Sequence, residues 1–165
     1  MLKILPILKS VNLVIGSVVC WLALIMVLLQ FSIVILRYVY GISFVFLNEG
    51  VLYMHASLFM LGAGYTLLKD DHVRVDIFYA KLSERGKSIT NILGAILLLI
   101  PSSLVIFWFT LPSVLNSWKI FEGAMSVGGI PASFLLKTLI PLFCVTLIIE
   151  GIANIIEESV KGKSE

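Results

Sequence analysis

The sequence predicts an all-α integral membrane protein with four transmembrane helices and both termini on the cytoplasmic side. Of its 165 residues, 59% are apolar and 13% are charged, whereas an average soluble domain is about half apolar and about a quarter charged. The mean hydropathy is +1.07. Apolar runs such as residues 92–101 lack alternating polar positions, which excludes the strand pattern of a membrane β-barrel. Lipid is therefore expected to surround most of the chain.

The first three predicted spans lie in stretches without Asp, Glu, Lys or Arg. These stretches are residues 10–36, 50–68 and 88–118, and a helix needs about 20 apolar residues to cross a hydrocarbon layer of about 30 Å. We therefore expect helices over about 11–36, 50–68 and 89–111. The first stretch exceeds the roughly 7–15 apolar residues of a signal peptide, so it is expected to be retained.

Prolines and aromatic residues predict where these spans bend and end. Pro101 is expected to kink the third helix because it cannot donate a backbone hydrogen bond, and Pro112 is expected to end it. The segment 38–48 is rich in aromatic residues, which favour the membrane–water interface. This segment is therefore expected to lie along the membrane surface, where it can form a short interfacial helix.

The fourth predicted span, residues 131–156, contains two charged residues. Pro131 is expected at its first helical position, where proline is favoured. Lys137 and Glu150 are 13 residues apart in the sequence, or about 20 Å along a helix. They are therefore expected to lie toward opposite faces of the bilayer.

Lys and Arg in short connections predict the orientation, because they accumulate on the cytoplasmic side. The connection 69–87 and the two terminal segments hold most of them, whereas the opposite connections hold Arg37 and Lys119. Both termini and the connection 69–87 are therefore expected in the cytoplasm. No internal repeat or long linker divides the chain, so residues 1–165 are expected to form a single membrane domain.

The residues that the spans lack disfavour several function classes. Ion-coupled transporters carry ionisable residues at membrane depth, but the first three spans have no Asp, Glu, Lys or Arg. Small four-helix drug exporters have a glutamate in their first helix, and a self-assembling channel needs a polar helix face. No basic stripe indicates nucleic-acid binding, and Cys20 and Cys144 have no metal-ligand spacing. The chain is not expected to carry a coupling pathway of its own.

One cluster of ionisable residues follows the second span. Asp70, Asp71, His72 and Asp76 could hold a divalent cation or form an acid–base pair, because His72 and Asp76 would be neighbours on a helix. No second cluster in the sequence completes such a site. The alternatives are a solvated cytoplasmic connection and the site of a stand-alone membrane enzyme or metal-binding protein.

Motifs from the second span onward resemble a known transporter subunit. They are Glu49, Gly62-Ala63-Gly64-Tyr65, His72-Val73-Arg74-Val75-Asp76, Ser117-Trp118, Glu122, Ser126, Gly128-Gly129-Ile130-Pro131, Lys137 and Pro141. In order and spacing they resemble the small membrane (Q-type) subunit of tripartite ATP-independent periplasmic (TRAP) transporters, over about residues 49–151. Many relatives have a tryptophan just before the glutamate of helix two, where this chain has Leu47-Asn48.

The resemblance implies a place in a three-part importer of the bacterial inner membrane. In such a system a soluble periplasmic protein captures an organic acid, and a large multi-helix subunit moves it with a sodium gradient. The small subunit braces the large one and helps to dock the periplasmic protein. Sodium and substrate then bind outside this chain, which is expected to have no catalytic site, metal site or cofactor.

Three polar residues are candidates for contacts between helices or subunits. Glu49 is expected at the N-terminus of the second helix, where the macrodipole favours a carboxylate, or paired with a partner subunit. His55 is expected to make a polar contact within the bundle. Glu150 lies about 9 Å from the midplane if the last span is centred near Cys144. It is expected to meet a cation or backbone donor of another subunit, or to reach the cytoplasmic surface beside Lys161.

The remaining candidates are positions for packing and docking. Gly62 and Gly64 are expected to let another helix approach the second span closely. With the resemblance, His72, Arg74 and Asp76 are expected to form a hydrogen-bonded cytoplasmic corner between helices two and three. The periplasmic turn before the last span is expected to dock a partner or simply to start a helix; its candidates are Glu122, Ser126, Gly128, Gly129, Pro131 and Lys137.

Overall fold

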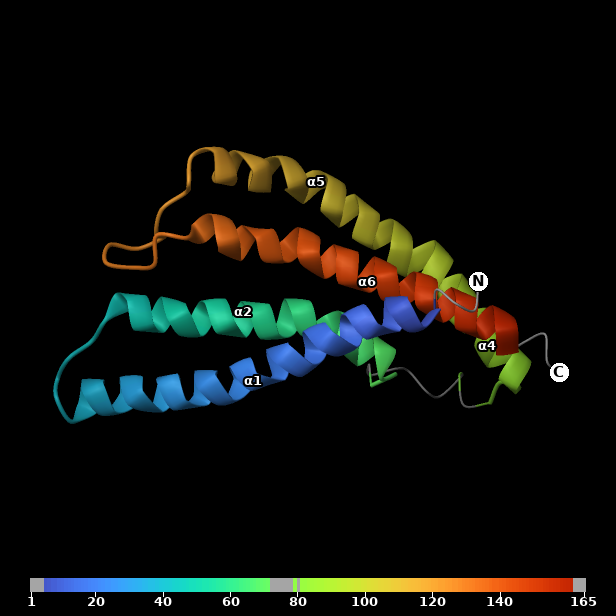
Figure 1. Ribbon diagram of the computed structural model, residues 1–165, viewed down its shortest axis with the longest axis horizontal. Coiled ribbons are helices and arrows are strands. Elements are labelled where there is room, and N and C mark those ends of the chain that lie inside the picture. The colour runs from blue at the N-terminus through green and yellow to red at the C-terminus, as the bar shows by residue number, and fades with distance from the viewer. Residues whose placement is uncertain (1–4, 72–78, 80, 162–165) are drawn as a thin grey trace.

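Every regular element of the described chain is a helix. The computed structural model describes residues 5–71, 79 and 81–161. The elements are α1 (Leu5–Tyr38), α2 (Val45–Leu68), α4 (Glu84–Gly94), the π-helical turn η1 (Ala95–Leu99), α5 (Ile100–Lys119) and α6 (Ser133–Lys161) (Figure 1). Since α4, η1 and α5 follow one another directly, four continuous stretches are long and apolar enough to cross a membrane. The predicted all-α class with four spans is confirmed.

The last span, α6, is the central helix of the bundle and contacts each of the other three spans. Figure 1 shows it running between α2 and α5, with α1 crossing beside α2. An 18-residue stretch of α6 is 39% buried, against 6–11% for the equivalent stretches of the other spans. The outer faces of α1, α2 and α5 are thus left for lipid or for a partner.

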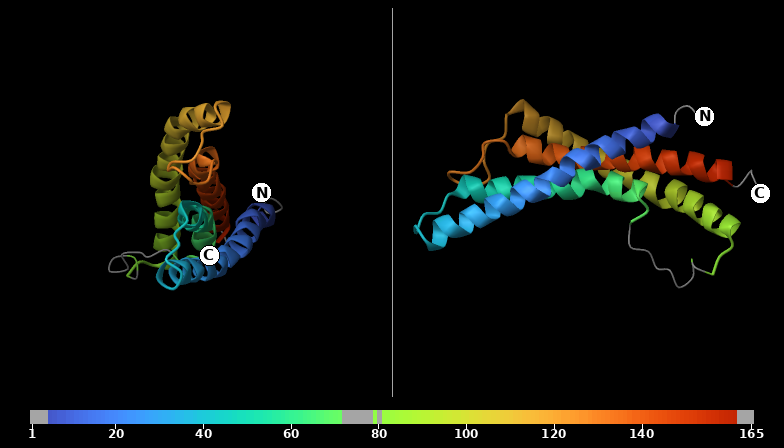
Figure 2. Two further views of the ribbon diagram at one scale, coloured as in Figure 1. Left: turned by 90° about the vertical axis from the view of Figure 1, so that its left-hand side faces the viewer. Right: turned by 60° about the horizontal axis from the view of Figure 1, so that its bottom comes forward.

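The α1–α2 loop and the α5–α6 loop lie together at one end of the bundle. Figures 1 and 2 show the α1–α2 and α5–α6 connections at this end, and the start of α1 and the end of α6 at the other. We call the end with these two loops the loop end, and the end with the start of α1 and the end of α6 the terminal end. The assignment of the terminal end to the cytoplasm stays a prediction from the Lys and Arg distribution.

The expected interfacial helix between the first two spans is absent from the structure, in which residues 39–44 form a non-helical connection. Gly41 has φ +68°, and the Ile42 N–H donates to the Leu36 carbonyl at 2.9 Å. Helices often end in this way at a glycine with a positive φ. The turn lets backbone N–H groups beyond the helix donate hydrogen bonds to the last carbonyl oxygens of the helix. The chain therefore turns within six residues, which leaves no room for a separate helix.

The third span is longer than the prolines predict. Pro112 does not end the helix: α5 continues through it to Lys119. In lipid, backbone N–H and C=O groups must form hydrogen bonds within the segment. A helix that ended at Pro112 would leave more of these groups without hydrogen bonds than a helix that continues through it. The π-helical turn η1 ends two residues before Pro101, and such turns accommodate local disruptions of the hydrogen-bond ladder.

The fourth span begins and ends later than expected. Pro131 is not its first helical residue, because α6 begins at Ser133. The Ala132 N–H instead donates to the Ile130 carbonyl at 2.8 Å, and the Ser133 hydroxyl donates to the carbonyl of Gly123 in the preceding loop. The start of α6 is therefore set by its contacts with the loop rather than by proline.

Candidate functional site

Glu49 connects α2 to the loop between α5 and α6. It lies in the second turn of α2, four residues after the helix starts, so it is not at the helix N-terminus as expected. The residue is 8% exposed, and its Oε2 accepts a hydrogen bond from the Ile130 N–H at 2.6 Å. A short bond from an amide to a carboxylate is charge-assisted and stronger than a neutral one. Glu49 therefore holds the loop against α2.

Gly129 makes this contact possible. A Cβ atom at Gly129 would lie 2.3 Å from both carboxylate oxygens of Glu49, which no side chain can tolerate. The Gly129 N–H donates to the Ser126 carbonyl at 3.0 Å, closing a turn. Within that turn Gly128 has φ +78°, a conformation that glycine adopts without a steric penalty. The two glycines thus shape the loop around Glu49.

A second anchor ties the start of the same loop to α5 and α6. The Lys137 ammonium of α6 lies 2.6 Å from Glu122 Oε2, and the Ser117 hydroxyl of α5 donates to the same oxygen. Beside them, the Trp118 Nε1–H donates to Thr138 Oγ1 at 2.9 Å. The sequence candidates Glu49, Glu122, Ser126, Gly128, Gly129, Pro131 and Lys137 thus gather at the loop end.

The pKa of Glu122 lies below its ordinary value of 4.5. The larger cause is the hydrogen bond from the Lys137 ammonium, and the smaller is the hydrogen bond from the Ser117 hydroxyl. Because the folded-state pKa is lowered, the pair stabilises the fold above pH 4.5 and loses this effect as the pH falls through the lowered pKa. We therefore expect acidification below that value to reduce the melting temperature of the wild type more than that of Glu122→Gln. Thermal unfolding at a series of pH values checks this. Equal slopes for the two proteins would contradict it.

The tip of this loop is apolar and exposed. Val127 is 99% exposed and Met125 is 60% exposed, while Phe121 and Ile120 at the end of α5 are 70% and 73% exposed. Single exposed apolar residues are common on proteins, but a contiguous group marks an interaction site. The loop end therefore presents an apolar surface on a rigidly anchored turn.

Glu150 is buried inside the chain rather than at either place predicted from the sequence. It is 0% exposed, as is Asn12 of α1, whose Nδ2 donates to Glu150 Oε2 at 2.9 Å. In this structure Glu150 neither reaches the surface nor leaves an exposed atom for another subunit. The missed signal was Asn12, a polar residue near the start of the first span, at the end where the last span finishes.

The expected close approach of another helix to α2 is found at Gly64 but not, among the described residues, at Gly62. A Cβ at Gly64 would lie 2.6 Å from Asn12 Oδ1, whereas nothing lies within 4 Å of one at Gly62. The closest approach involves Gly16, which sequence reasoning missed: its Cβ would lie 2.2 Å from the Tyr65 ring. Close packing within the chain thus uses Gly16 and Gly64, while a packing role for Gly62 requires a partner helix.

His55 makes no polar contact with any other residue that the structure describes, contrary to the expected contact within the bundle. Its ring is exposed and packs on Phe59, with 4.5 Å between ring centroids. Phe59 is itself 64% exposed and Leu52 is 47% exposed. By helical rise, His55 lies about 15 Å from the start of α2, so an imidazole faces outward at membrane depth.

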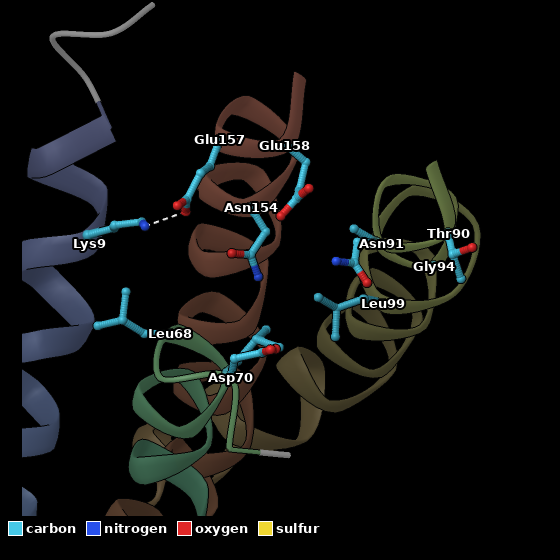
Figure 3. Close-up of a pocket in the computed structure, with 12 residues that line it drawn as sticks. Lys9, Leu68, Asp70, Thr90, Asn91, Gly94, Leu99, Asn154, Glu157 and Glu158 are labelled. Atoms are coloured by element: carbon cyan, nitrogen blue, oxygen red, sulfur yellow. Dashed lines mark hydrogen bonds and ion pairs between the residues drawn. The ribbon is translucent and has the colours of Figure 1, made fainter. Parts of the chain in front are cut away.

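The terminal end holds a cavity of about 380 Å³ between α1, α2, α4 and α6. Figure 3 shows Lys9 paired with Glu157 on one side, and Asp70, Asn91 and Asn154 around it. His72, Arg74 and Asp76 lie outside the described residues, so the predicted corner and the alternative metal site stay untested there. Within the described ranges, no three His, Cys, Asp or Glu side chains form a group suited to a metal ion.

Comparison with known families identifies a family for most of the chain. A family model described as tripartite ATP-independent periplasmic transporters, DctQ component, matches residues 25–160. This range includes the end of α1, both loops of the loop end and all but the last residue of α6. Comparison with curated proteins and with solved structures gave no match.

Proposed function

Because the chain belongs to the DctQ family of tripartite ATP-independent periplasmic transporter components, we propose that it is the small permease subunit of a sodium-coupled importer of organic acids. It is a multi-pass component of the inner membrane. In this proposal it braces the large transport subunit and presents a docking surface to the periplasmic substrate-binding protein. Substrate and sodium bind to those partners.

Beyond the family, the observation that carries the proposal is that two carboxylates within the spans, Glu49 and Glu150, are buried inside the bundle. Glu49 and Glu150 are 8% and 0% exposed and accept hydrogen bonds from Ile130 and Asn12 of the same chain. Ion pathways need ionisable groups that a passing ion can reach. These two groups serve contacts inside the bundle, which supports the proposal that the coupling site lies in the large subunit.

The large subunit is proposed to cover the outer face of α2. Lipid tails cannot hydrogen-bond the imidazole of His55, and polar side chains at membrane depth usually find partners on other helices. Gly62 lies two turns further along α2, with open space where a Cβ would be, so a second helix can approach closely there. His55, Phe59 and Gly62 thus form a face suited to a transmembrane helix with a hydrogen-bonding group.

The periplasmic protein is proposed to dock on the loop end. The Lys and Arg distribution supports a periplasmic position for this end, and its exposed apolar tip at Met125 and Val127 is suited to a protein partner. Glu49 and Glu122 hold this loop to three helices. A preorganised loop binds with less loss of conformational entropy than a mobile one.

Reconstitution with and without the partners tests the function. Proteoliposomes that contain this chain, a large subunit of the transporter and the periplasmic protein should accumulate a carboxylate solute only with an inward sodium gradient. Leaving out this chain should reduce uptake to the background of empty vesicles. Uptake by this chain alone, or full uptake without it, would refute the proposal.

A further inference from the structure

Among the described residues, four buried side-chain oxygen atoms lack a hydrogen-bond partner, and two of them belong to one side-chain pair, Asn12 and Glu150. Asn12 Nδ2 already donates to Glu150 Oε2 at 2.9 Å and to the Thr146 carbonyl at 3.2 Å. The other oxygens of the pair, Asn12 Oδ1 and Glu150 Oε1, have no hydrogen-bond partner among the residues that the structure describes. An ionised carboxylate is only an acceptor. An ionised Glu150 would therefore leave two buried acceptors unsatisfied in one side-chain pair.

An ionised Glu150 would also be a buried charge without a direct counterion. Among the described residues, the charged groups that influence its carboxyl group electrostatically are Lys9 of α1 and Glu157 of α6, and these two are paired with each other. Glu157 lies seven residues from Glu150, or about 10 Å by helical rise. Next to the pair, α2 places Gly64 against Asn12, and Leu99 of η1 packs against Gly151. A buried charge in such uncharged surroundings costs far more than a neutral acid.

We propose that Glu150 binds a proton and forms a cyclic acid–amide pair with Asn12. The carboxylic O–H donates from Glu150 Oε1 to Asn12 Oδ1, while the Asn12 amide continues to donate to Glu150 Oε2. One bound proton thus removes the charge and satisfies both acceptors. The pair then joins the first and last spans by two hydrogen bonds within this chain, and needs no cation from the large subunit.

Infrared spectroscopy and one isosteric variant test this directly. The full-length chain in lipid nanodiscs at neutral pH should show a carboxylic-acid C=O band that shifts in D₂O and is lost in Glu150→Gln. The glutamine N–H replaces the acid O–H, so we expect Glu150→Gln to melt within roughly 2 °C of the wild type, and Glu150→Leu to melt roughly 5 °C lower or more.

Glu158→Gln is the matched control, because it removes a glutamate of the same helix that is not among the charged groups acting on Glu150, and it should leave the acid band unchanged. If Glu150→Leu does not fold, the wild-type band and the behaviour of Glu150→Gln still decide. Absence of the acid band from the wild type would overturn the proposal in favour of an ionised, water-bridged carboxylate. A Glu150→Gln protein that melts as low as Glu150→Leu would overturn it as well.

Discussion

Replacing Gly16 with alanine is expected to destabilise the bundle by about 1–3 kcal/mol, the usual cost of overpacking a close contact. The new Cβ would lie 2.2–2.5 Å from three atoms of the Tyr65 side chain, including the ring-bearing Cβ. Because Tyr65 Cβ is fixed to α2, the helices α1 and α2 must separate or shift. Thermal unfolding of the full-length chain in detergent or nanodiscs measures the effect as a lower melting temperature.

Gly62→Ala is the matched control for this substitution. It also places alanine in a transmembrane helix, but no residue that the structure describes lies within 4 Å of the added Cβ, and alanine favours a helix over glycine by up to about 1 kcal/mol. Gly62→Ala should therefore melt no lower than the wild type in the isolated chain. If both variants melted at the same temperature, the close contact between Gly16 and Tyr65 would be wrong.

Replacing Glu49 with leucine is expected to abolish substrate uptake by the reconstituted transporter. The change leaves the Ile130 N–H without its acceptor, which costs about 1–3 kcal/mol when the donor is buried, and it releases the loop that we propose as the docking surface. Binding of the periplasmic protein to vesicles should weaken at least tenfold, which corresponds to about 1.4 kcal/mol. Glu49→Gln keeps an oxygen acceptor for Ile130 and should retain most of the uptake.

Glu84→Leu controls for the loss of a carboxylate as such. Glu84 starts α4 on the opposite side of the bundle, at the terminal end, and its side chain is 75% exposed. This variant should bind the periplasmic protein and transport substrate as the wild type does. Normal docking by Glu49→Leu would show that the loop end does not recognise the partner.

The sequence alone determined the class of protein, the number of spans and their approximate positions. Long stretches without charge can be solvated only by lipid, and lipid requires each segment to satisfy its own backbone hydrogen bonds as a helix. These requirements act on each segment separately, so composition and charge spacing were enough. The motif order from Glu49 to Pro141 was also sufficient to predict the family, which the match over residues 25–160 confirmed.

Only the tertiary structure decided which residues meet. The pairs Glu49–Ile130 and Asn12–Glu150 join residues 81 and 138 positions apart, and Gly16 meets Tyr65 across two helices. The spacing of apolar residues cannot predict such contacts in a membrane, because lipid and neighbouring helices are equally apolar. Any face of a span can therefore point either toward lipid or toward another helix. Packing of small residues and pairing of the few polar groups set the faces, and both depend on all four helices being in place.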